Sequence, residues 1–286
     1  MNLRAVRKKI RSIRNVRKIT KAMQMVSAVK MRKAQENEME SRPYRDGLHA
    51  IINKIAPHVG PEHSTLLSNE NTGDRNLVIF VTSNKGLAGA FNINLFRFLI
   101  RTNLDFKKTD FITVGHKGAQ FVSRMGGTIL ADFSEGKALI QVSAIFDFVL
   151  DKYLSEDNYR TVSVVYNKFV STLRCENMIE RLLPFSLEAD IEKTEEINRK
   201  EYLIEPSPEQ IIDQLLKSFI EDRIRGAIIS SEAVEHSMRM MAMKNATDNA
   251  QDVIYNLTLV GNKLRQEKIT NELLDMITAK ESVEAS

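Results

Sequence analysis

The stretch LRAVRKKIRSIRNVRKITKAMQMVSAV, residues 3–29, decides the class of fold that we expect. Its apolar side chains recur at steps of three and four residues, which is the spacing of an amphipathic helix. Because consecutive three-residue steps turn this stripe around the helix axis, the pattern is not that of a regular leucine zipper. The stripe consists of Leu3, Val6, Ile10, Ile13, Val16, Ile19, Met23, Val26 and Val29.

The same stretch carries an unbalanced charge. Residues 1–35 hold twelve Lys or Arg and no Asp or Glu, although the net charge of the whole chain is only +4. Like charges four residues apart on a helix repel each other, so a basic face this dense indicates an anionic partner. Nucleic acid, a lipid surface and acidic loops of another protein all satisfy the charge alone.

The other end of the chain repeats the helical pattern. The six prolines fall within residues 43–208, so both ends can form long helices. Ser207 before Pro208 suits a helix start, and one helix over 209–280 would be about 108 Å long at 1.5 Å per residue. Neither arm is apolar enough to be buried on all sides, so we expect the two arms to pair as a coiled coil. The apolar positions are Ile212, Leu215, Phe219, Val234, Met238, Met241, Val253, Leu257, Val260 and Leu264.

The middle of the chain predicts a sheet with helices packed on it, because short β-rich runs alternate with helical stretches. The predicted strands are 76–82, 111–115, 128–133 and 161–166, and the predicted helices are 91–102, 116–125 and 137–154. Turn-forming segments at 57–75 and 190–206 read as linkers. The expected fold is therefore α/β plus long helices: a coiled coil of residues 1–57 and 207–286 with a central Rossmann-like domain at 76–190.

Composition excludes several classes of protein. Hydrophobic residues make up 43% and charged residues 27% of the 286 residues, as in folded globular domains. The longest apolar runs, such as Leu77 to Val81, are far shorter than the roughly 20 residues that cross a bilayer. Cys175 is the single cysteine, which excludes an internal disulfide and favours a reducing compartment.

A glycine-containing turn, SNKGLAGAFN, follows the first predicted strand at residues 83–92. A phosphate site is one interpretation of such a turn before a helix. However, Lys85 precedes Gly86, the reverse of a P-loop, and three glycines at dinucleotide-binding spacing are missing. We therefore expect a structural turn here, and a nucleotide-binding α/β enzyme is the weaker interpretation.

Metal and hydrolytic chemistry are not predicted either. The five histidines show no HExxH pairing, and Cys175 has no second cysteine for a zinc site. No serine stands in a Gly-x-Ser-x-Gly motif. The sequence thus predicts no catalytic residue, no metal ligand and no bound cofactor.

A basic nucleic-acid-binding coiled coil is the main alternative function. Against it, the first aromatic residue is Tyr44, so the basic arm has no side chain on which single-stranded bases could stack. No regular zipper follows the basic stretch, as that class of protein requires. Acidic loops on a protein partner account for the charge better.

Methionines gather in the second arm. Met238 and Met241 fall on its apolar stripe, where we expect them to fill the core. Met240 and Met243 fall off the stripe, so we expect them on a surface that meets non-identical neighbours.

Four blocks of sequence resemble ATP synthase gamma subunits, in that family's order along the chain. They are KITKAMQMVSAVKMR at 18–32, TSNKGLAGAFN at 82–92, SEAVEHSMRMMAMKNATDNA at 231–250 and RQEKITNELLD at 265–275. The resemblance implies that the terminal helices form an antiparallel coiled coil, with the α/β domain between them in sequence.

The resemblance also implies the role of a non-catalytic rotor shaft. The coiled coil would occupy the bore of a hexamer of three alpha and three beta subunits. The foot would sit, with the epsilon subunit, on the membrane ring of c subunits. Rotation coupled to proton flow would then change the affinities of the beta sites. The implied location is the cytoplasmic face of a bacterial inner membrane, with membrane association only through the c ring.

By matched position, the resemblance implies three groups of partner-binding residues. Residues facing acidic loops at the base of the beta subunits would be Lys21, Met23, Lys30 and Arg32. Residues of the C-terminal helix contacting the bore would be Arg239, Arg265, Gln266, Thr270 and Glu272. Lys85 and Gly86 would lie near the neighbours at the foot.

Two positions depart from the family pattern. Thr278-Ala279-Lys280 stands where the family commonly has Gly-Gly-Ala. Gly261 replaces the usual tyrosine, which we expect to loosen that turn of helix by about 1 kcal/mol.

Overall fold

A computed structural model describes residues 2–55, 59, 60, 63, 64, 66, 67, 73–155, 159–185, 205 and 207–284. Contacts divide the chain into two compact units, which are considered separately below. Unit 1 is Met1–Ser27 with Arg239–Ser286, and unit 2 is Ala28–Met238. The two long helices, α1 (Leu3–Ile55) and α6 (Pro208–Glu284), each contribute residues to both units.

Both terminal helices lie within the ranges 1–57 and 207–286 that we expected and fill nearly all of them. Helix α1 continues through Pro43 to Ile55, although the proline-free stretch ends at residue 42. Helix α6 begins at Pro208, directly after Ser207, and runs for 77 residues. The predicted pair of long terminal helices is confirmed.

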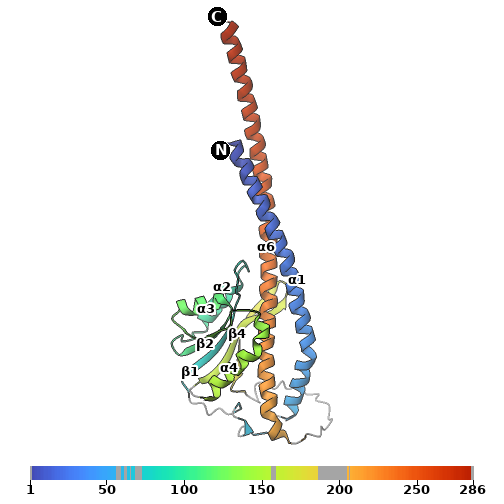
Figure 1. Cartoon of the computed structure of the whole chain (residues 1–286), viewed down its shortest axis with the longest axis vertical. Coiled ribbons are helices and arrows are strands. Elements are labelled where there is room, and N and C mark those ends of the chain that lie inside the picture. Colours follow the sequence, from blue (N-terminus) through green and yellow to red (C-terminus); the bar gives the residue numbers. More distant parts are fainter. Residues whose placement is uncertain are drawn as a thin grey trace. The chain divides into compact units, whose positions relative to one another are not determined.

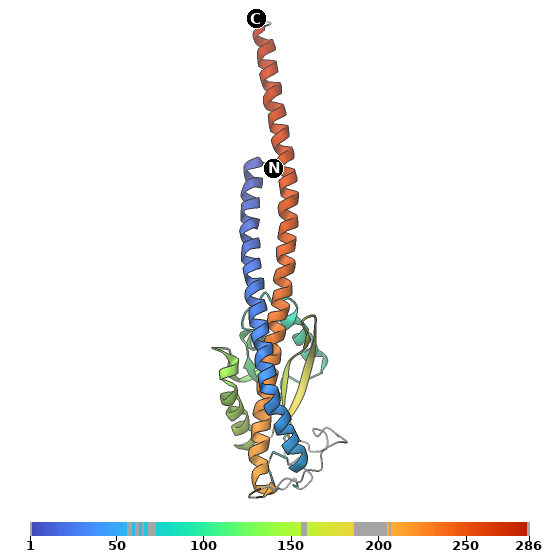
Figure 2. The same ribbon diagram turned by 90° about the vertical axis from the view of Figure 1, so that its right-hand side faces the viewer.

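In unit 1, α1 and α6 lie side by side and antiparallel (Figures 1 and 2). The Oγ1 atoms of Thr20 and Thr247 are 2.8 Å apart, and Arg17 donates a hydrogen bond to Gln251. Nearer the N-terminus of α1, the Cγ1 of Val6 lies 3.5 Å from the position that a Cβ on Gly261 would take. Residue numbers therefore rise along α1 as they fall along α6, as an antiparallel coiled coil requires.

The face of α1 that packs on α6 in unit 1 differs from the predicted apolar stripe. Buried positions recur every seven residues at Val6, Thr20 and Ser27, with half-buried Ile13 between them. In contrast, Val16, Ile19 and Val26 are 49%, 60% and 56% exposed. A strict seven-residue repeat keeps one face on the partner helix, and small side chains on that face let two helices approach closely. The apolar stripe was therefore only partly right: Val6 and Ile13 belong to it and lie on the buried face, whereas Val16, Ile19 and Val26 do not.

Helix α6 supplies the matching face in unit 1. Met243, Ala250 and Ile254 are buried, and Leu257, Gly261 and Leu264 are half-buried at the same three- and four-residue steps. Met243 is only 5% exposed, so our expectation of a surface position for it was wrong.

Unit 2 contains a five-stranded sheet in the order β3-β2-β1-β4-β5. Strands β3, β2, β1 and β4 run parallel to one another, and the edge strand β5 is antiparallel to β4. In β1, Ile79 is in register with Ile112 of β2 and with Val164 of β4. The strands are β1 (Arg75–Val81), β2 (Thr109–Val114), β3 (Thr128–Asp132), β4 (Tyr159–Ser171) and β5 (Arg174–Leu183).

Helices cover both faces of this sheet (Figure 1). Val78 and Phe80 of β1 pack towards α2 (Phe91–Arg101) and α3 (His116–Arg124). Leu77 and Ile79 point to the other face, which is covered by α4 (Val142–Ser155) and α6, with the end of α1 in the same apolar cluster. A short 3-10 helix, η3 (Ala138–Ile140), precedes α4. The alternation follows from the two-residue period of a strand.

Two features of unit 2 were not expected. Strand β5 is missing from our prediction because it is an edge strand in which polar residues occupy half of the positions and interrupt the apolar run. Helix α6 was expected to be exposed on one side, but its consecutive residues Ala227, Ile228 and Ile229 are all buried. Three consecutive residues span most of a helix circumference, so α6 is enclosed in this part of unit 2. The predicted linkers at 57–75 and 190–206 lie largely outside the described residues.

Candidate functional site

The SNKG turn is braced by its own polar groups. The Ser83 N–H donates to Asn92 Oδ1 at 3.2 Å, and Asn92 Nδ2 donates to Ser83 Oγ at 2.7 Å. Asn84 Oδ1 accepts the His116 N–H at 2.9 Å, which ties the turn to the start of α3. Leu87 and Gly89 adopt φ values of 63° and 58°, the left-handed conformation that tight turns use. These contacts are those of a structural turn.

Helix α6 fills the place where related sheets bind ligands. In open α/β sheets the ligand lies beyond the carboxyl ends of the strands, where the strand order reverses, which here is between β1 and β4. Ala88 and Phe91, from the turn after β1, instead form a buried cluster with Val234 of α6, against which Phe169 of β4 packs. The Phe169 N–H also donates to Ser230 Oγ of α6 at 2.7 Å. This arrangement argues against nucleotide binding at the switch point.

The basic residues implied to face a partner are exposed along α1. In unit 1, Lys21 is exposed and donates to Gln24 Oε1 at 3.3 Å, while Met23 beside it is half-buried. In unit 2, Lys30 and Arg32 are exposed. Lys and Arg side chains on an exposed helix face create a positive potential that attracts an anionic surface.

Lys85 and Gly86, at the tip of the SNKG turn in unit 2, are also exposed. A Cβ on Gly86 would meet no atom within 4 Å, so no close packing or special backbone conformation explains this glycine. Contact of these two residues with a partner stays a prediction.

The C-terminal part of α6 in unit 1 has a different character. Every described side chain from residue 265 to residue 279 is exposed, including Arg265, Gln266, Thr270 and Glu272. Thr270 Oγ1 donates to the Gln266 carbonyl of its own helix at 3.0 Å, and Glu272 pairs with Lys268 at 3.3 Å. Arg239, by contrast, is only 8% exposed, so it differs from the other implied contact residues of α6.

The sequence analysis did not single out the apolar side chains of this same segment. An apolar side chain on a surface costs solvation free energy unless a partner covers it, and a contiguous group of them usually marks an interaction site. The sequence already indicated such a surface, because the apolar residues of this segment fall on more than one face of the helix. They are Ile269, Leu273, Leu274, Met276 and Ile277, each 50–62% exposed.

The sequence analysis also missed a buried charge cluster in unit 2. Arg45 of α1 pairs with Asp222 of α6 at 3.1 Å, and the Asp222 side chain is only 6% exposed. The signal that could have found it is an Asp-Arg pair, residues 222–223, between the apolar residues Ile220 and Ile224.

Ionisable groups elsewhere in the described part of the chain show neither a metal-binding cluster nor an activated thiol. Within the described ranges, no three His, Cys, Asp or Glu side chains come together as a metal site. Burial raises the pKa of the half-buried Cys175 thiol above its ordinary value, which disfavours the reactive thiolate. Over those ranges no helix combines the length and apolarity that a bilayer crossing requires.

Comparison with known proteins gives a consistent result. A family model described as ATP synthase matches residues 2–283. The ATP synthase gamma chain of Geobacter sp. (strain M21) is 37% identical over 292 residues, covering 99% of each chain. That of Psychrobacter cryohalolentis is 36% identical over 286 residues, covering 96% of this chain and 97% of the other.

Solved structures share the fold at lower identity. A chain of the Euglena gracilis mitochondrial ATP synthase, in a structure of OSCP, F1 and c-ring, has a TM-score of 0.69 at 19% identity, covering 99% of this chain and 95% of that one. A chain of the Tetrahymena thermophila mitochondrial ATP synthase central stalk and c-ring has a TM-score of 0.57 at 24% identity, covering 80% and 99%. Because the family model and relatives above 30% identity span nearly its whole length, the chain belongs to the ATP synthase gamma-chain family.

Proposed function

We propose that this chain is the central rotor shaft of an ATP synthase F1 sector. It couples rotation of the c ring to ATP synthesis or hydrolysis at the alpha and beta subunits, and it holds no catalytic residue of its own. The observation that carries the proposal is the full-length match to gamma chains, over residues 2–283. Family membership therefore favours a shaft over a basic nucleic-acid-binding coiled coil.

The exposed end of α6 suits the bore of an alpha-beta hexamer. Arg265, Gln266, Thr270 and Glu272 offer polar contacts, and the surrounding apolar side chains offer contacts that are favourable only when water is excluded. A single helix presents a different face to each of three surrounding subunits. Unequal contact energies can shift the conformational equilibria of three otherwise equivalent sites, which equal contacts could not do.

The cations of α1 suit acidic loops at the base of the beta subunits. Lys21, Lys30 and Arg32 are exposed, and Met23 adds an adaptable apolar contact next to Lys21. An acidic partner surface would offset the mutual repulsion of these charges, and its attraction would weaken as salt rises. Arg239 belongs to the proposed bore contacts of α6 and not to this surface, and because it is 8% exposed its contact with the bore requires that binding uncover it.

The foot contacts are also part of the proposal. Lys85 and Gly86 would face the epsilon subunit or the c ring, and membrane association would be indirect, through that ring. The corresponding location is the cytoplasmic face of a bacterial inner membrane.

We also propose three domains, residues 1–57, 76–190 and 207–286, as the boundaries for truncated variants.

Reconstitution tests the proposal. The full chain, mixed with purified alpha, beta and epsilon subunits, should co-elute with them as a complex that hydrolyses ATP. The triple variant Lys21→Glu, Lys30→Glu and Arg32→Glu should bind beta more weakly, because it reverses three charges at the proposed contact. Wild-type binding should also weaken as salt rises.

A matched control separates the proposed surface from general charge. Arg101→Glu, Lys107→Glu and Arg124→Glu reverse three exposed cations on or beside α2 and α3, so this triple variant should assemble as the wild type does. Absence of wild-type co-elution with alpha and beta would refute the shaft. Equal losses in the two triple variants would refute the contact surface alone.

A further inference from the structure

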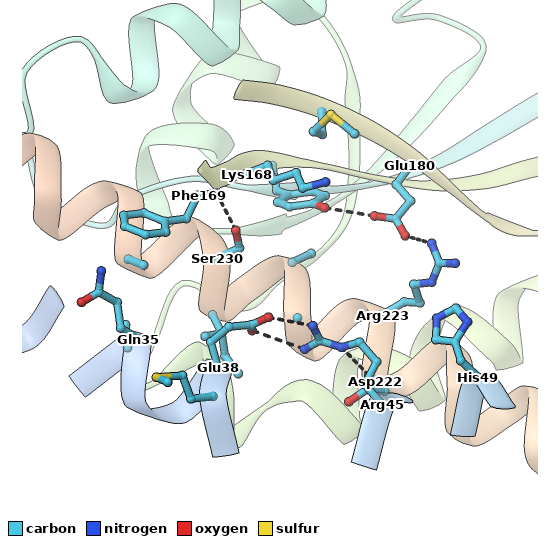
Figure 3. A pocket seen from close by; sticks show the side chains of 18 residues that line it. Gln35, Glu38, Arg45, His49, Lys168, Phe169, Glu180, Asp222, Arg223 and Ser230 are labelled. Carbon is cyan, nitrogen blue, oxygen red and sulfur yellow. Dashed lines mark hydrogen bonds and ion pairs between the residues drawn. The ribbon is translucent and has the colours of Figure 1, made fainter. Parts of the chain in front are cut away.

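Unit 2 contains a cavity of about 810 Å³ between α1, α6 and the β4–β5 hairpin (Figure 3). Its walls include small residues on both helices, among them Ala34 of α1 and Gly226 and Ala233 of α6. Packed side chains normally hold neighbouring helices together through many dispersion contacts, and a void forfeits the contacts across it. Leu48 and Ile52 of α1 pack in the apolar core with α6 at one end of this cavity, but along the cavity itself the contacts between the two helices need another source.

Charged side chains of alternating sign supply that interaction. The two terminal nitrogens of Arg45 in α1 donate hydrogen bonds of 2.7 and 3.3 Å to the Glu38 carboxylate, which lies on the same helix. Its Nε donates to Asp222 Oδ2 of α6 at 3.1 Å. Figure 3 shows the Arg45 guanidinium between these two carboxylates.

The next residue of α6 continues the connection to the sheet. Arg223 pairs with Glu180 of β5, and the Tyr166 hydroxyl of β4 donates to the same carboxylate at 3.0 Å. We call Glu38, Arg45, Asp222, Arg223 and Glu180 the charged ladder. It links α1 to α6 and α6 to the sheet along the wall of the cavity.

The geometry around Arg45 leaves little freedom. The Arg45 side chain is 25% exposed and that of Asp222 is 6% exposed, so the pair is screened from water. A Cβ on Gly226 would lie 3.2 Å from Arg45 Nη2, so a glycine at this turn of α6 leaves room for the guanidinium. The hydrogen bonds to Glu38 and Asp222 raise the pKa of Arg45 above its ordinary value.

We infer that Arg45 is a positioning residue, which locks α1 to α6 across the cavity so that unit 2 transmits torque without slip between these helices. The inference rests on the proposed shaft function. A shaft under torque loads its helix-helix contacts sideways, and directional hydrogen bonds to a buried carboxylate resist such displacement beside the cavity, where fewer side chains pack across the gap. Arg45 touches no reacting group, and its effect is on the coupling between rotation and chemistry.

Three variants test the inference in the full chain and in the reassembled enzyme on proton-pumping vesicles. Arg45→Met leaves Asp222 buried without its partner, so amide exchange of residues 41–48 should accelerate about 100-fold. In the complex, ATP hydrolysis should continue while protons pumped per ATP fall about twofold or more. Arg42→Met, which removes an exposed cation paired to Asp46 in its own helix, should change neither readout.

The double variant Arg45→Met with Asp222→Leu separates positioning from simple stability. Replacing both charges by apolar groups removes the buried unpaired carboxylate, so amide exchange should return to within about tenfold of wild type. The polar lock stays absent, so the proton-to-ATP ratio should stay low. A ratio that recovers in the double variant, or that never falls in Arg45→Met, overturns the inference.

Failure of the proposed function would look different. A wild-type chain that does not assemble with alpha and beta refutes the shaft itself. The inference about Arg45 fails when the wild type is coupled and either Arg45→Met or the double variant is as coupled as the wild type.

Discussion

Gly261→Ala offers a quantitative test of how α1 and α6 meet in unit 1. Glycine in a helix interior is about 0.8–1.0 kcal/mol less favourable than alanine. The added Cβ would lie 3.5 Å from Val6 Cγ1, which is an ordinary van der Waals contact that requires no displacement. Partial burial of one methyl group adds up to about 0.8 kcal/mol. We therefore expect a local stabilisation of about 1–1.5 kcal/mol.

Amide hydrogen exchange is the appropriate assay, because a long helix pair opens locally as well as globally. At 1.36 kcal/mol per factor of ten, the expected stabilisation slows exchange about 5- to 12-fold in the helical turns around residue 261. Exchange that is unchanged or faster would refute the reasoning. It would mean that Val6 and Gly261 approach more closely than the structure shows, or that the two helices pair in another register.

The same substitution at Gly226 is the matched comparison, and there we expect the opposite sign. Its helix-propensity gain is the same, about 1 kcal/mol. Its Cβ would lie 3.2 Å from Arg45 Nη2, a contact that forces the guanidinium to shift. Loss of a hydrogen bond to a charged group costs about 1.5–3 kcal/mol, which exceeds the gain. Faster exchange in Gly226→Ala beside slower exchange in Gly261→Ala would confirm both local geometries.

Four further substitutions test the stability of the chain and, at Leu273, its assembly with partner subunits. Pro43 is exposed inside α1, so Pro43→Ala should restore a helical hydrogen bond and stabilise that region by about 2–3 kcal/mol. Urea unfolding measures this, and a lower urea concentration at the midpoint of unfolding would contradict it. Leu216 is 0% exposed, so Leu216→Ala should cost about 2–5 kcal/mol. Leu273 is 52% exposed, so Leu273→Ala should leave chain stability nearly unchanged while weakening assembly with alpha and beta. The contact with His236 lowers the pKa of Glu232 below its ordinary 4.5, so its carboxylate stabilises the fold above about pH 4.5 and loses that contribution as pH falls through the lowered pKa. The stability difference between wild type and Glu232→Gln should therefore shrink on acidification, and a pH-independent difference would exclude this role.

The exposed end of α6 and the charged ladder are proposed to serve different functions, binding and coupling, through different physical effects. The end of α6 presents uncovered apolar side chains, such as Leu273 and Ile277, whose free energy falls when a partner covers them. The ladder instead relies on directional, partly buried charge pairs, of which the pair at the buried Asp222 loses most if its partner is removed. Substitutions at the first site should change binding, and substitutions at the second should change coupling.

Helix and strand positions depend mainly on local sequence, which is why most of them could be predicted. The three- and four-residue spacing in residues 3–29 and the absence of proline after residue 208 are sufficient for two long helices. Strands β1, β2 and β3 begin and end within about two residues of the predicted runs, because each is a short β-rich stretch between turn signals. The exposure of Lys21, Lys30 and Arg32 follows from their charge, since an unpaired cation is costly to bury.

Only the tertiary structure decided which side of each helix is buried and which distant residues meet. Thr20 and Ser27 lie on the buried face of α1 because helices that approach closely need small side chains between them. The larger Ile19 and Val26 are left on the surface, where a partner could cover them. Arg45 and Asp222 are 177 positions apart, and no local pattern indicates that they pair. The sequence by itself determined the helices, the sheet class and the basic end of the chain. Packing between distant segments decided the helix seam, the edge strand β5 and the charged ladder, because those features depend on the free energy of contacts that local spacing does not encode.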